Sequence, residues 1–223
     1  RSSSKKARSG YRAEESAGRE EAATLEGVPQ NVWRIGTIVT LVIAASLRLY
    51  NLNLVPLHHD EGVNGNFLVR LVRENVYVYD PENYHGPTLY YFAALIPWAT
   101  KLLFGTSARE NLGLTTFTIR LIPALFGIGT IALVFLLRKR LGTVATLAAG
   151  MMLAVSPGAV YLSRYFIHET LFVFFTLAIV VSAVRFYDDR NPAYLIPVAA
   201  SAALLFATKE TAMISAGVLI IAF

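Results

Sequence analysis

The sequence predicts an all-α protein, a polytopic bundle of transmembrane helices with an outer loop of juxtamembrane helices. Two observations predict this fold class. The 223 residues are 55% hydrophobic and only 16% charged, whereas about a quarter of the residues in soluble domains are charged. The apolar residues also gather into runs that approach the length of about 20 residues needed to cross a bilayer as a helix.

The composition excludes several classes of function. Because the chain has no cysteine, thiol catalysis, zinc–thiolate sites and iron–sulfur clusters are ruled out, and histidine and carboxylates are left as the strong metal ligands. The formal net charge is +5, but the basic residues are scattered between apolar runs. We interpret them as charges that flank membrane spans and expect no nucleic-acid partner.

The first 30 residues differ from the rest of the chain. Residues 1–30 contain many charged and few apolar side chains, which is typical of a disordered tail. We expect a cytoplasmic tail, because Lys and Arg beside a first span favour the inner side of the membrane. Residues 31–223 are predicted to be the N-terminal part of a transmembrane domain that continues beyond Phe223, since the last apolar run stops short of a full span.

Six uncharged runs mark the predicted spans. The first, Ile35–Leu47, reaches span length if the long side chains of Arg34 and Arg48 extend to the two interfaces. The others are Leu121–Leu137, Leu141–Ser163, Thr170–Val184, Asn191–Thr208 and Thr211–Phe223. Together these runs predict at least five spans and the start of a sixth.

A further apolar run, Asn83–Thr100, either spans the membrane or lies at its surface. Its prolines, tyrosines and tryptophan suit the headgroup region. Surface placement puts Arg138-Lys139-Arg140 on the inner side and gathers Glu169, Lys209-Glu210 and Asp60-Glu61 on the outer face. Spanning placement separates these acidic groups. Both placements give the same number of Lys and Arg residues inside and the same number outside, so this count does not distinguish them. We favour the surface placement because it creates one polar outer face.

The outer loop, about Asn51 to Thr118, is predicted to contain a helix over Asp60–Glu74. Its apolar residues return at helical spacing and give one apolar face. Asp60 and Glu61 occupy the first turn, where carboxylates suit the positive end of the helix dipole.

The segment His58-His59-Asp60-Glu61 is the first candidate for chemistry. Two adjacent acids can supply a general base and a neighbour that tunes it, because like charges push pKa values apart. Histidine and carboxylate also bind divalent cations, with His59 and Asp60 as candidate ligands, although adjacent residues cannot all face one ion. The alternative is a structural helix cap beside solvated histidines.

Further polar groups lie downstream. Residues 76–91 place tyrosines, including Tyr84, beside Asp80, Glu82 and His85, a composition typical of carbohydrate sites. An ordinary aromatic belt is the alternative. Residues 163–170 and Lys209-Glu210 lie at the ends of apolar runs. Ionisable residues in such positions are functional candidates or form local ion pairs. The proposed outer face contains all four histidines, which are His58, His59, His85 and His168.

In this order the segments resemble the membrane-embedded GT-C glycosyltransferases, among them protein O-mannosyltransferases and aminoarabinose transferases. The resemblance covers roughly residues 31–223. It rests on the Asp-Glu pair, the HGPTLYY segment, RLIPALFG from Arg120, residues 164–169 and the TKET segment at 208–211. The string HHDEGVNGNFLVRLVRENVYVYDPENYHGPTLYY is similar to the prokaryotic flippase activity-associated family of the archaeal N-glycosylation pathway.

The resemblance implies a GT-C-like fold and transfer of a sugar from a polyprenyl-phosphate donor to an acceptor on the outer face of the cell membrane. It assigns Asp60 as the base for the acceptor hydroxyl, with Glu61 beside it and Glu169 as a second carboxylate. His85 stands where relatives carry a phosphate-binding lysine, and Arg120 is either structural or close to the phosphate. The substrate-binding candidates are His85, Lys209, Arg120, His168, Tyr84 and Glu210.

The sequence also leaves other functions open. A flippase or flippase accessory would move the polyprenyl-linked sugar without chemistry, and a structural subunit would use these charges only to orient its spans. The expected partners are the donor and membrane lipid. No cofactor is predicted, a divalent metal stays open, and the sugar, the acceptor and the oligomeric state are not determined by the sequence.

Overall fold

The computed structural model describes residues 28–82, 85–104 and 113–222, so the predicted tail lies almost wholly outside the described residues. The all-α class is confirmed. Within those ranges the chain forms helices and no strand, and the one pairing of extended residues is an isolated bridge between His85 and Lys209.

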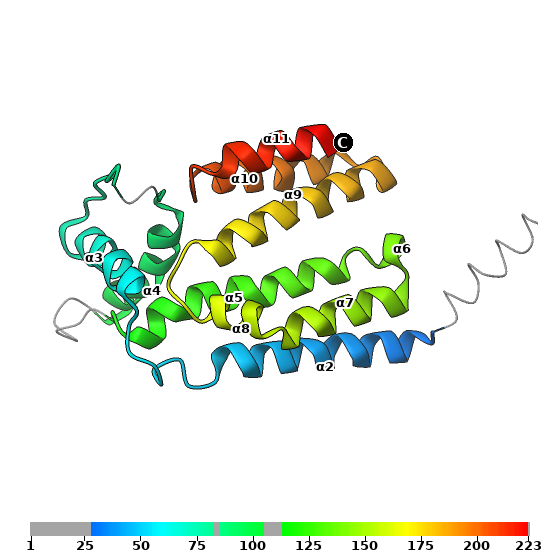
Figure 1. Cartoon of the computed structure of the whole chain (residues 1–223), viewed down its shortest axis with the longest axis horizontal. Helices are drawn as coiled ribbons and strands as arrows, with labels where there is room; N and C mark the ends of the chain where they lie inside the picture. Colours follow the sequence, from blue (N-terminus) through cyan, green and yellow to red (C-terminus); the bar gives the residue numbers. More distant parts are fainter. Residues whose placement is uncertain (1–27, 83–84, 105–112, 223) are drawn as a thin grey trace, which may run out of the picture.

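Among the residues that the structure describes, three helices are long and apolar enough to cross a membrane. They are α2 (Gln30–Leu49), α5 (Thr116–Phe135) and α9 (Glu169–Asp189), and each contains the better part of a predicted run. Figure 1 shows them running lengthwise through one bundle, in which α5 packs against both α2 and α9.

The last two predicted runs form shorter helices. The 3₁₀ turn η2 (Pro192–Tyr194) leads into α10 (Leu195–Phe206), and α11 (Ala212–Ala222) follows. Both helices are apolar but fall short of span length. By length and composition, the described residues therefore contain fewer complete spans than the five predicted.

The run Leu141–Ser163, predicted as one span, is bent in the structure. It contains α7 (Thr143–Val155) and α8 (Pro157–Ser163), which meet at an angle of 60°. Pro157 explains the break, because proline lacks the N–H that would continue the helix and its ring clashes with the carbonyl four residues earlier. The pair counts as a fourth span at most.

Arg48 binds the C-terminal end of α7, where the break leaves backbone carbonyls without helical partners. Its Nη1 donates to the carbonyl of Ala154 at 2.9 Å and its Nη2 donates to the carbonyl of Leu153 at 3.1 Å. The Leu153 carbonyl would otherwise pair with the N–H of residue 157, which proline lacks. The Arg48 side chain is 1% exposed, so the prediction that it extends to the membrane interface is wrong.

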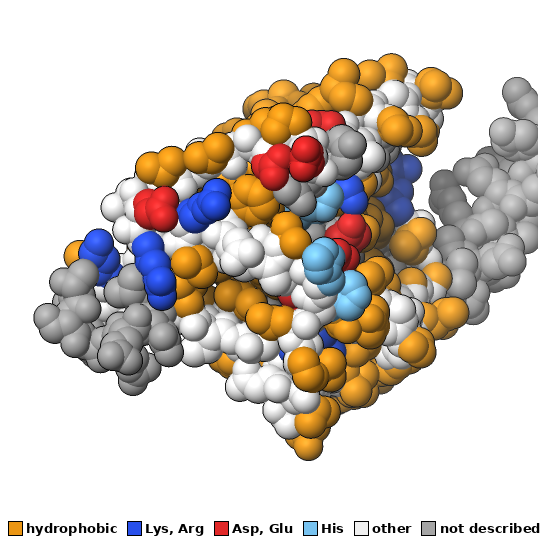
Figure 2. Space-filling view, turned by 60° about the vertical axis from the view of Figure 1, so that its left-hand side comes forward, with side chains coloured by type: hydrophobic (Ala, Val, Ile, Leu, Met, Phe, Trp, Pro, Cys, Tyr) orange, Lys and Arg blue, Asp and Glu red, His pale blue; other side chains and the backbone are white. Residues whose placement is uncertain are grey.

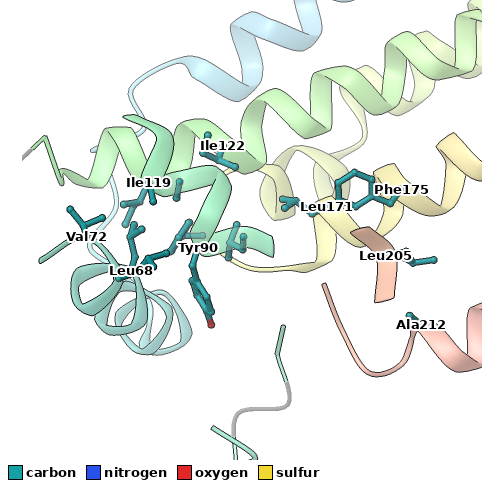
Figure 3. Packing of buried hydrophobic residues seen from close by; sticks show 14 residues of the cluster. Leu68, Val72, Tyr90, Ile119, Ile122, Leu171, Phe175, Leu205 and Ala212 are labelled. Carbon is teal, nitrogen blue, oxygen red and sulfur yellow. The ribbon is translucent and has the colours of Figure 1, made fainter. Parts of the chain in front are cut away.

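Two helices lie together at one end of the bundle (Figure 1): α3 (His59–Glu74) and α4 (Thr88–Phe104). The predicted apolar face of α3 packs on protein, with Leu68 and Val72 close to Tyr90 of α4 and Ile119 of α5 (Figure 3). Helix α4 occupies the ambiguous run and has 17 residues. Its position with α3 at the bundle end fits the surface placement.

The opposite end of the bundle carries the basic cluster. Helix α6 (Arg138–Leu141) lies there beside the C-terminal end of α9 (Figure 1). Lys139 Nζ is 3.0 Å from Asp189 Oδ1, and Arg140 Nε donates to Asp188 Oδ2 at 3.0 Å. Figure 1 shows α6 at the opposite end of the bundle from α3, from the start of α9 and from the α10–α11 connection, which is the arrangement expected if Asn83–Thr100 lies at the membrane surface.

Candidate functional site

The predicted polar residues gather at the end of the bundle formed by α3 and α4. The N-terminal ends of α3, α5 and α9 all point to this end, and the α10–α11 connection returns to it. Figure 2 turns this end toward the viewer and shows histidine and acidic side chains beside one another on its surface. The topology therefore brings together segments that are up to 150 residues apart, from His59 to Lys209.

The first turn of α3 presents Asp60 to solvent and turns Glu61 inward. His58 caps the helix, because its Nδ1 accepts from Asp60 N at 3.4 Å and its own N–H donates to Glu61 Oε2 at 3.0 Å. The Asp60 side chain is 65% exposed and Glu61 is fully buried. Successive helical residues differ in direction by about 100°, which is why two adjacent acids occupy such different environments.

Glu61 forms a buried bidentate ion pair with Arg120 of α5. Arg120 Nε donates to Oε1 at 2.7 Å and Nη2 donates to Oε2 at 2.6 Å. The N–H of Phe166 donates to Oε1 at 2.9 Å. Burial alone would raise the pKa of Glu61, but the hydrogen bonds from Arg120, His58 and Phe166 outweigh it and lower the pKa below its ordinary value. Glu61 is therefore ionised and saturated with donors.

Arg120 also fixes the loop that leads into α3. Its Nη1 donates to the carbonyls of Leu52 and Val55 at 2.7 and 2.9 Å, and its Nη2 donates to that of Pro56 at 3.2 Å. All five N–H groups of the guanidinium are thus bonded within the protein. This arrangement supports the structural alternative for Arg120 and leaves no donor for a phosphate.

Asn64 is a polar residue of this site that the sequence analysis missed. Its Nδ2 donates to the carbonyl of Phe166 at 2.9 Å, and its Oδ1 accepts from the hydroxyl of Tyr90 at 2.8 Å. Both backbone groups of Phe166 are consequently held by α3. The signal was present in the sequence, because Asn64 falls one helical turn after Glu61 on the face that contains Leu68 and Leu71.

The segment from His85 to Thr88 crosses the end of α10 in close backbone contact. Gly86 N donates to the carbonyl of Thr208 at 3.1 Å, and Thr88 N donates to that of Ala207 at 3.3 Å. A Cβ at Gly86 would lie 2.6 Å from the carbonyl carbon of Ala207, which is closer than side chains come. Glycine is therefore required here by space, and the crossing sets His85 beside Lys209.

His85 and His168 form a pair of rings behind this crossing. Their centroids are 4.6 Å apart, and His168 Nε2 lies 3.1 Å from the carbonyl oxygen of Gly86. His168 is fully buried. Burial, with a smaller contribution from His85, lowers the pKa of His168 to about 3, so its ring is neutral and donates from Nε2. It acts here as a hydrogen-bond link between the start of α9 and Gly86.

Glu169 and Lys209 form an ion pair at the site, with Lys209 Nζ 2.8 Å from Glu169 Oε1. Both side chains are partly exposed, at 40% for Glu169 and 25% for Lys209. Glu210 accepts a hydrogen bond from the hydroxyl of Tyr79. The outer-loop tyrosine and the α10–α11 connection are thereby joined.

The structure brings together most of the predicted site residues in two groups. Glu61 and Arg120 meet at the base of α3, beneath exposed Asp60, while the second group contains His85, His168, Glu169, Lys209 and Glu210. Tyr84 lies outside the described residues. In the part of the chain that the structure describes, no three His, Asp or Glu side chains converge to hold a metal, so the candidate pair His59 and Asp60 gains no further ligand.

Comparison with known proteins places the chain in a family. The family model for dolichyl-phosphate-mannose-protein mannosyltransferases matches residues 84–223, more than half of the chain. The chain belongs to this family. Its members are GT-C membrane glycosyltransferases that use polyprenyl-phosphate sugars, so the chain is a membrane glycosyltransferase of this general kind. The mannosyltransferase match contains His85, Arg120, Glu169 and Lys209 but begins after Asp60. Neither a curated protein nor a solved structure matches.

Proposed function

We propose that the chain transfers a hexose or a pentose from a polyprenyl-phosphate donor to an acceptor hydroxyl, with Asp60 as the general base. One observation carries the proposal. Glu61 and Arg120 form a buried bidentate pair that holds the first turn of α3, and this leaves the exposed carboxylate of Asp60 at the end of the bundle that also carries Lys209. A base must be held in place and reach its substrate, and Asp60 meets both conditions.

The reaction needs a base beside the acceptor hydroxyl and a cation beside the phosphate of the donor. Asp60 takes the proton from the acceptor hydroxyl as its oxygen attacks the anomeric carbon. The bond between that carbon and the phosphate oxygen breaks, and the polyprenyl phosphate leaves with additional negative charge. Lys209 is the cation that we assign to this charge, and Glu169, 2.8 Å from its ammonium, orients it.

The other predicted residues receive positioning roles in this proposal. Glu61 and Arg120 are saturated by one another and by the backbone, so neither contacts substrate. His168 holds the Gly86 carbonyl, and His85 lies at the crossing beside Lys209. Glu210 holds Tyr79.

An apolar cavity beside the crossing suits the lipid part of the donor. It has a volume of about 330 Å³ and lies between α4 and the end of α10, where Thr88, Tyr91, Trp98 and Leu204 contribute to its walls. Burying a methylene group in such surroundings stabilises a complex by about 0.8 kcal/mol. We propose that part of the isoprenyl chain binds there, near Lys209.

We further propose that the N-terminus is cytoplasmic and that the site faces outward. The likeness of residues 58–91 to the archaeal flippase activity-associated family supports a role in a glycosylation pathway at the outer face, with the acceptor left open. The separation of the basic cluster on α6 from Asp60 and Lys209 supports the orientation, because basic clusters favour the inner side.

Vesicles that contain the full-length protein and a labelled polyprenyl-phosphate mannose test the transferase proposal. Label that moves into an acceptor fraction from expressing cells supports it. Movement of intact donor across the bilayer without formation of a mannosylated product would overturn it in favour of a flippase.

A further inference from the structure

We infer that a second cavity, between α3 and residues 78–81, binds a single sugar ring as a subsite of the proposed transferase. The cavity has a volume of about 460 Å³, within the range of small-molecule sites. Helix α3 contributes Asn66, Phe67 and Arg70 to its lining, and the loop contributes Tyr79 and Asp80. The inference rests on the proposed function for the kind of sugar, but the chemistry of the lining carries the site.

The lining combines aromatic rings with hydrogen-bonding groups. A sugar ring presents C–H groups on its faces, which pack on aromatic rings, and hydroxyls around its edge. Phe67 and Tyr79 supply the rings, while the Asn66 amide, the Arg70 guanidinium and the Asp80 carboxylate supply donors and acceptors for hydroxyls. This mixture matches a sugar better than it matches a lipid tail.

Both rings are held before a ligand arrives. Phe67 stacks on Tyr90 with ring centroids 5.4 Å apart, and the hydroxyl of Tyr79 donates to Glu210. Asp80 is also fixed, because its Oδ1 accepts from Glu82 N at 2.9 Å. Preorganised walls reduce the entropy lost on binding.

The charges of the lining favour a neutral ligand. Arg70 and Asp80 are its charged side chains, and their formal charges cancel. A phosphate would meet the Asp80 carboxylate, and an amine would meet the Arg70 guanidinium. A neutral ring with several hydroxyls can use both as hydrogen-bonding partners, since hydrogen bonds to charged groups are the stronger ones.

Residues of the cavity lining lie on segments that also lead to Asp60 and to Lys209. Asp60, Phe67 and Arg70 recur at helical spacing, so one stripe of α3 leads from the base to the cavity. At about 1.5 Å per residue, Phe67 is roughly 10 Å from Asp60 along the helix axis. Tyr79 reaches Glu210, the neighbour of Lys209. The sugar ring that binds in this cavity belongs either to the donor or to an acceptor glycan.

Binding of methyl α-D-mannopyranoside to the full-length protein in nanodiscs tests the subsite by saturation-transfer NMR. The wild type is expected to bind this probe. Asp80→Asn keeps the side-chain size and can still accept the Glu82 N–H, and it should weaken the probe about tenfold through loss of a charged acceptor. Glu82→Gln changes a carboxylate outside the lining and should leave binding unchanged.

The outcomes separate the subsite from the proposed function. No probe binding to the wild type, or equal binding to Asp80→Asn, overturns the subsite. Asp60→Asn should bind the probe as the wild type does, although it should lose transfer. Probe binding to a wild-type protein that transfers no sugar would keep the subsite and overturn the transferase. Citronellyl-phosphate mannose, a short donor analogue, identifies the source: displacement of the probe assigns the ring to the donor, and simultaneous binding assigns it to the acceptor.

Discussion

Arg120 and Glu61 form a buried bidentate ion pair, with Nε 2.7 Å from Oε1 and Nη2 2.6 Å from Oε2. The pair joins α5 to the first turn of α3 and, through the other three N–H bonds of Arg120, to the loop before it. The backbone of Asp60, one residue before Glu61, is therefore held in place, although the Asp60 side chain faces solvent.

Breaking this pair should destabilise the protein strongly. Glu61→Gln leaves the Arg120 charge buried without its partner, and Arg120→Met does the same to Glu61, at a cost of about 3 kcal/mol or more for each. Thermal unfolding in detergent measures the loss. The double variant Glu61→Gln/Arg120→Met should lose less than the two single losses combined, because it leaves no unpaired charge. Additive losses would show that the residues do not act as a pair.

A matched control comes from the other end of the bundle. Lys139 makes an exposed ion pair with Asp189, and its side chain is 64% exposed. Lys139→Met should cost less than about 1 kcal/mol. A cost as large as that of Glu61→Gln would contradict the distinction between buried and exposed pairs.

Gly86→Ala should disrupt the crossing between residues 85–88 and the end of α10. The added methyl overlaps the carbonyl of Ala207, and backbone cannot move aside as a flexible side chain can, so we expect a loss of about 2 kcal/mol. Gly65→Ala is the control, because a Cβ there meets nothing within 4 Å. In the interior of α3 it should stabilise by about 0.5–1 kcal/mol. Equal melting temperatures for wild type and Gly86→Ala would refute the close approach.

Stability should fall on acidification because of His168. Its pKa is lowered to about 3 in the folded protein, chiefly by burial, whereas an unfolded histidine titrates near 6.5. The unfolded state therefore binds the proton first. Stability is complete above about pH 6.5 and declines toward pH 3, by at most about 1.4 kcal/mol per pH unit.

Unfolding measured between pH 7 and 4 checks this dependence. His168→Gln keeps a donor for the Gly86 carbonyl and does not titrate, so its stability should change less with pH than that of the wild type. The exposed His59 provides the control, and His59→Gln should keep the wild-type slope. Parallel curves for wild type and His168→Gln would exclude the buried neutral ring.

The two ends of the bundle should face opposite sides of the membrane. The chain has no cysteine, so single-cysteine variants report location directly. A cysteine in place of Glu74 on α3 should react with a membrane-impermeant maleimide on intact cells. One in place of Lys139 on α6 should react only after permeabilisation. The reverse pattern would place the site on the inner side. If both cysteines reacted from the same side, the two ends of the bundle would not face opposite sides of the membrane.

The class of fold and most helices follow from the sequence because long apolar runs and helical periodicity are local signals. Pro157 is also a local signal, and its break in the run 141–163 could have been predicted from the missing N–H. The burial of Arg48 could not, since it depends on carbonyls more than 100 residues away at the end of α7.

The composition of the site was predictable in part. Four segments with acids or histidines were identified, and they do lie at one end of the bundle. The different environments of Asp60 and Glu61 follow from helical spacing, which puts Glu61 on the face with Asn64, Leu68 and Leu71. The pairing of Glu61 with Arg120, 59 residues later, depends on tertiary packing, which no local pattern encodes.

The rate of mannose transfer by Asp60→Asn tests the proposed function most directly. Membranes from cells that express the full-length protein receive labelled polyprenyl-phosphate mannose, and label in the acceptor is followed with time. Loss of a general base should lower the rate at least about 100-fold, with the melting temperature nearly unchanged because the side chain is exposed. Glu74→Gln, an exposed carboxylate on the same helix, should keep the wild-type rate. Wild-type transfer by Asp60→Asn would contradict the role of Asp60 as base.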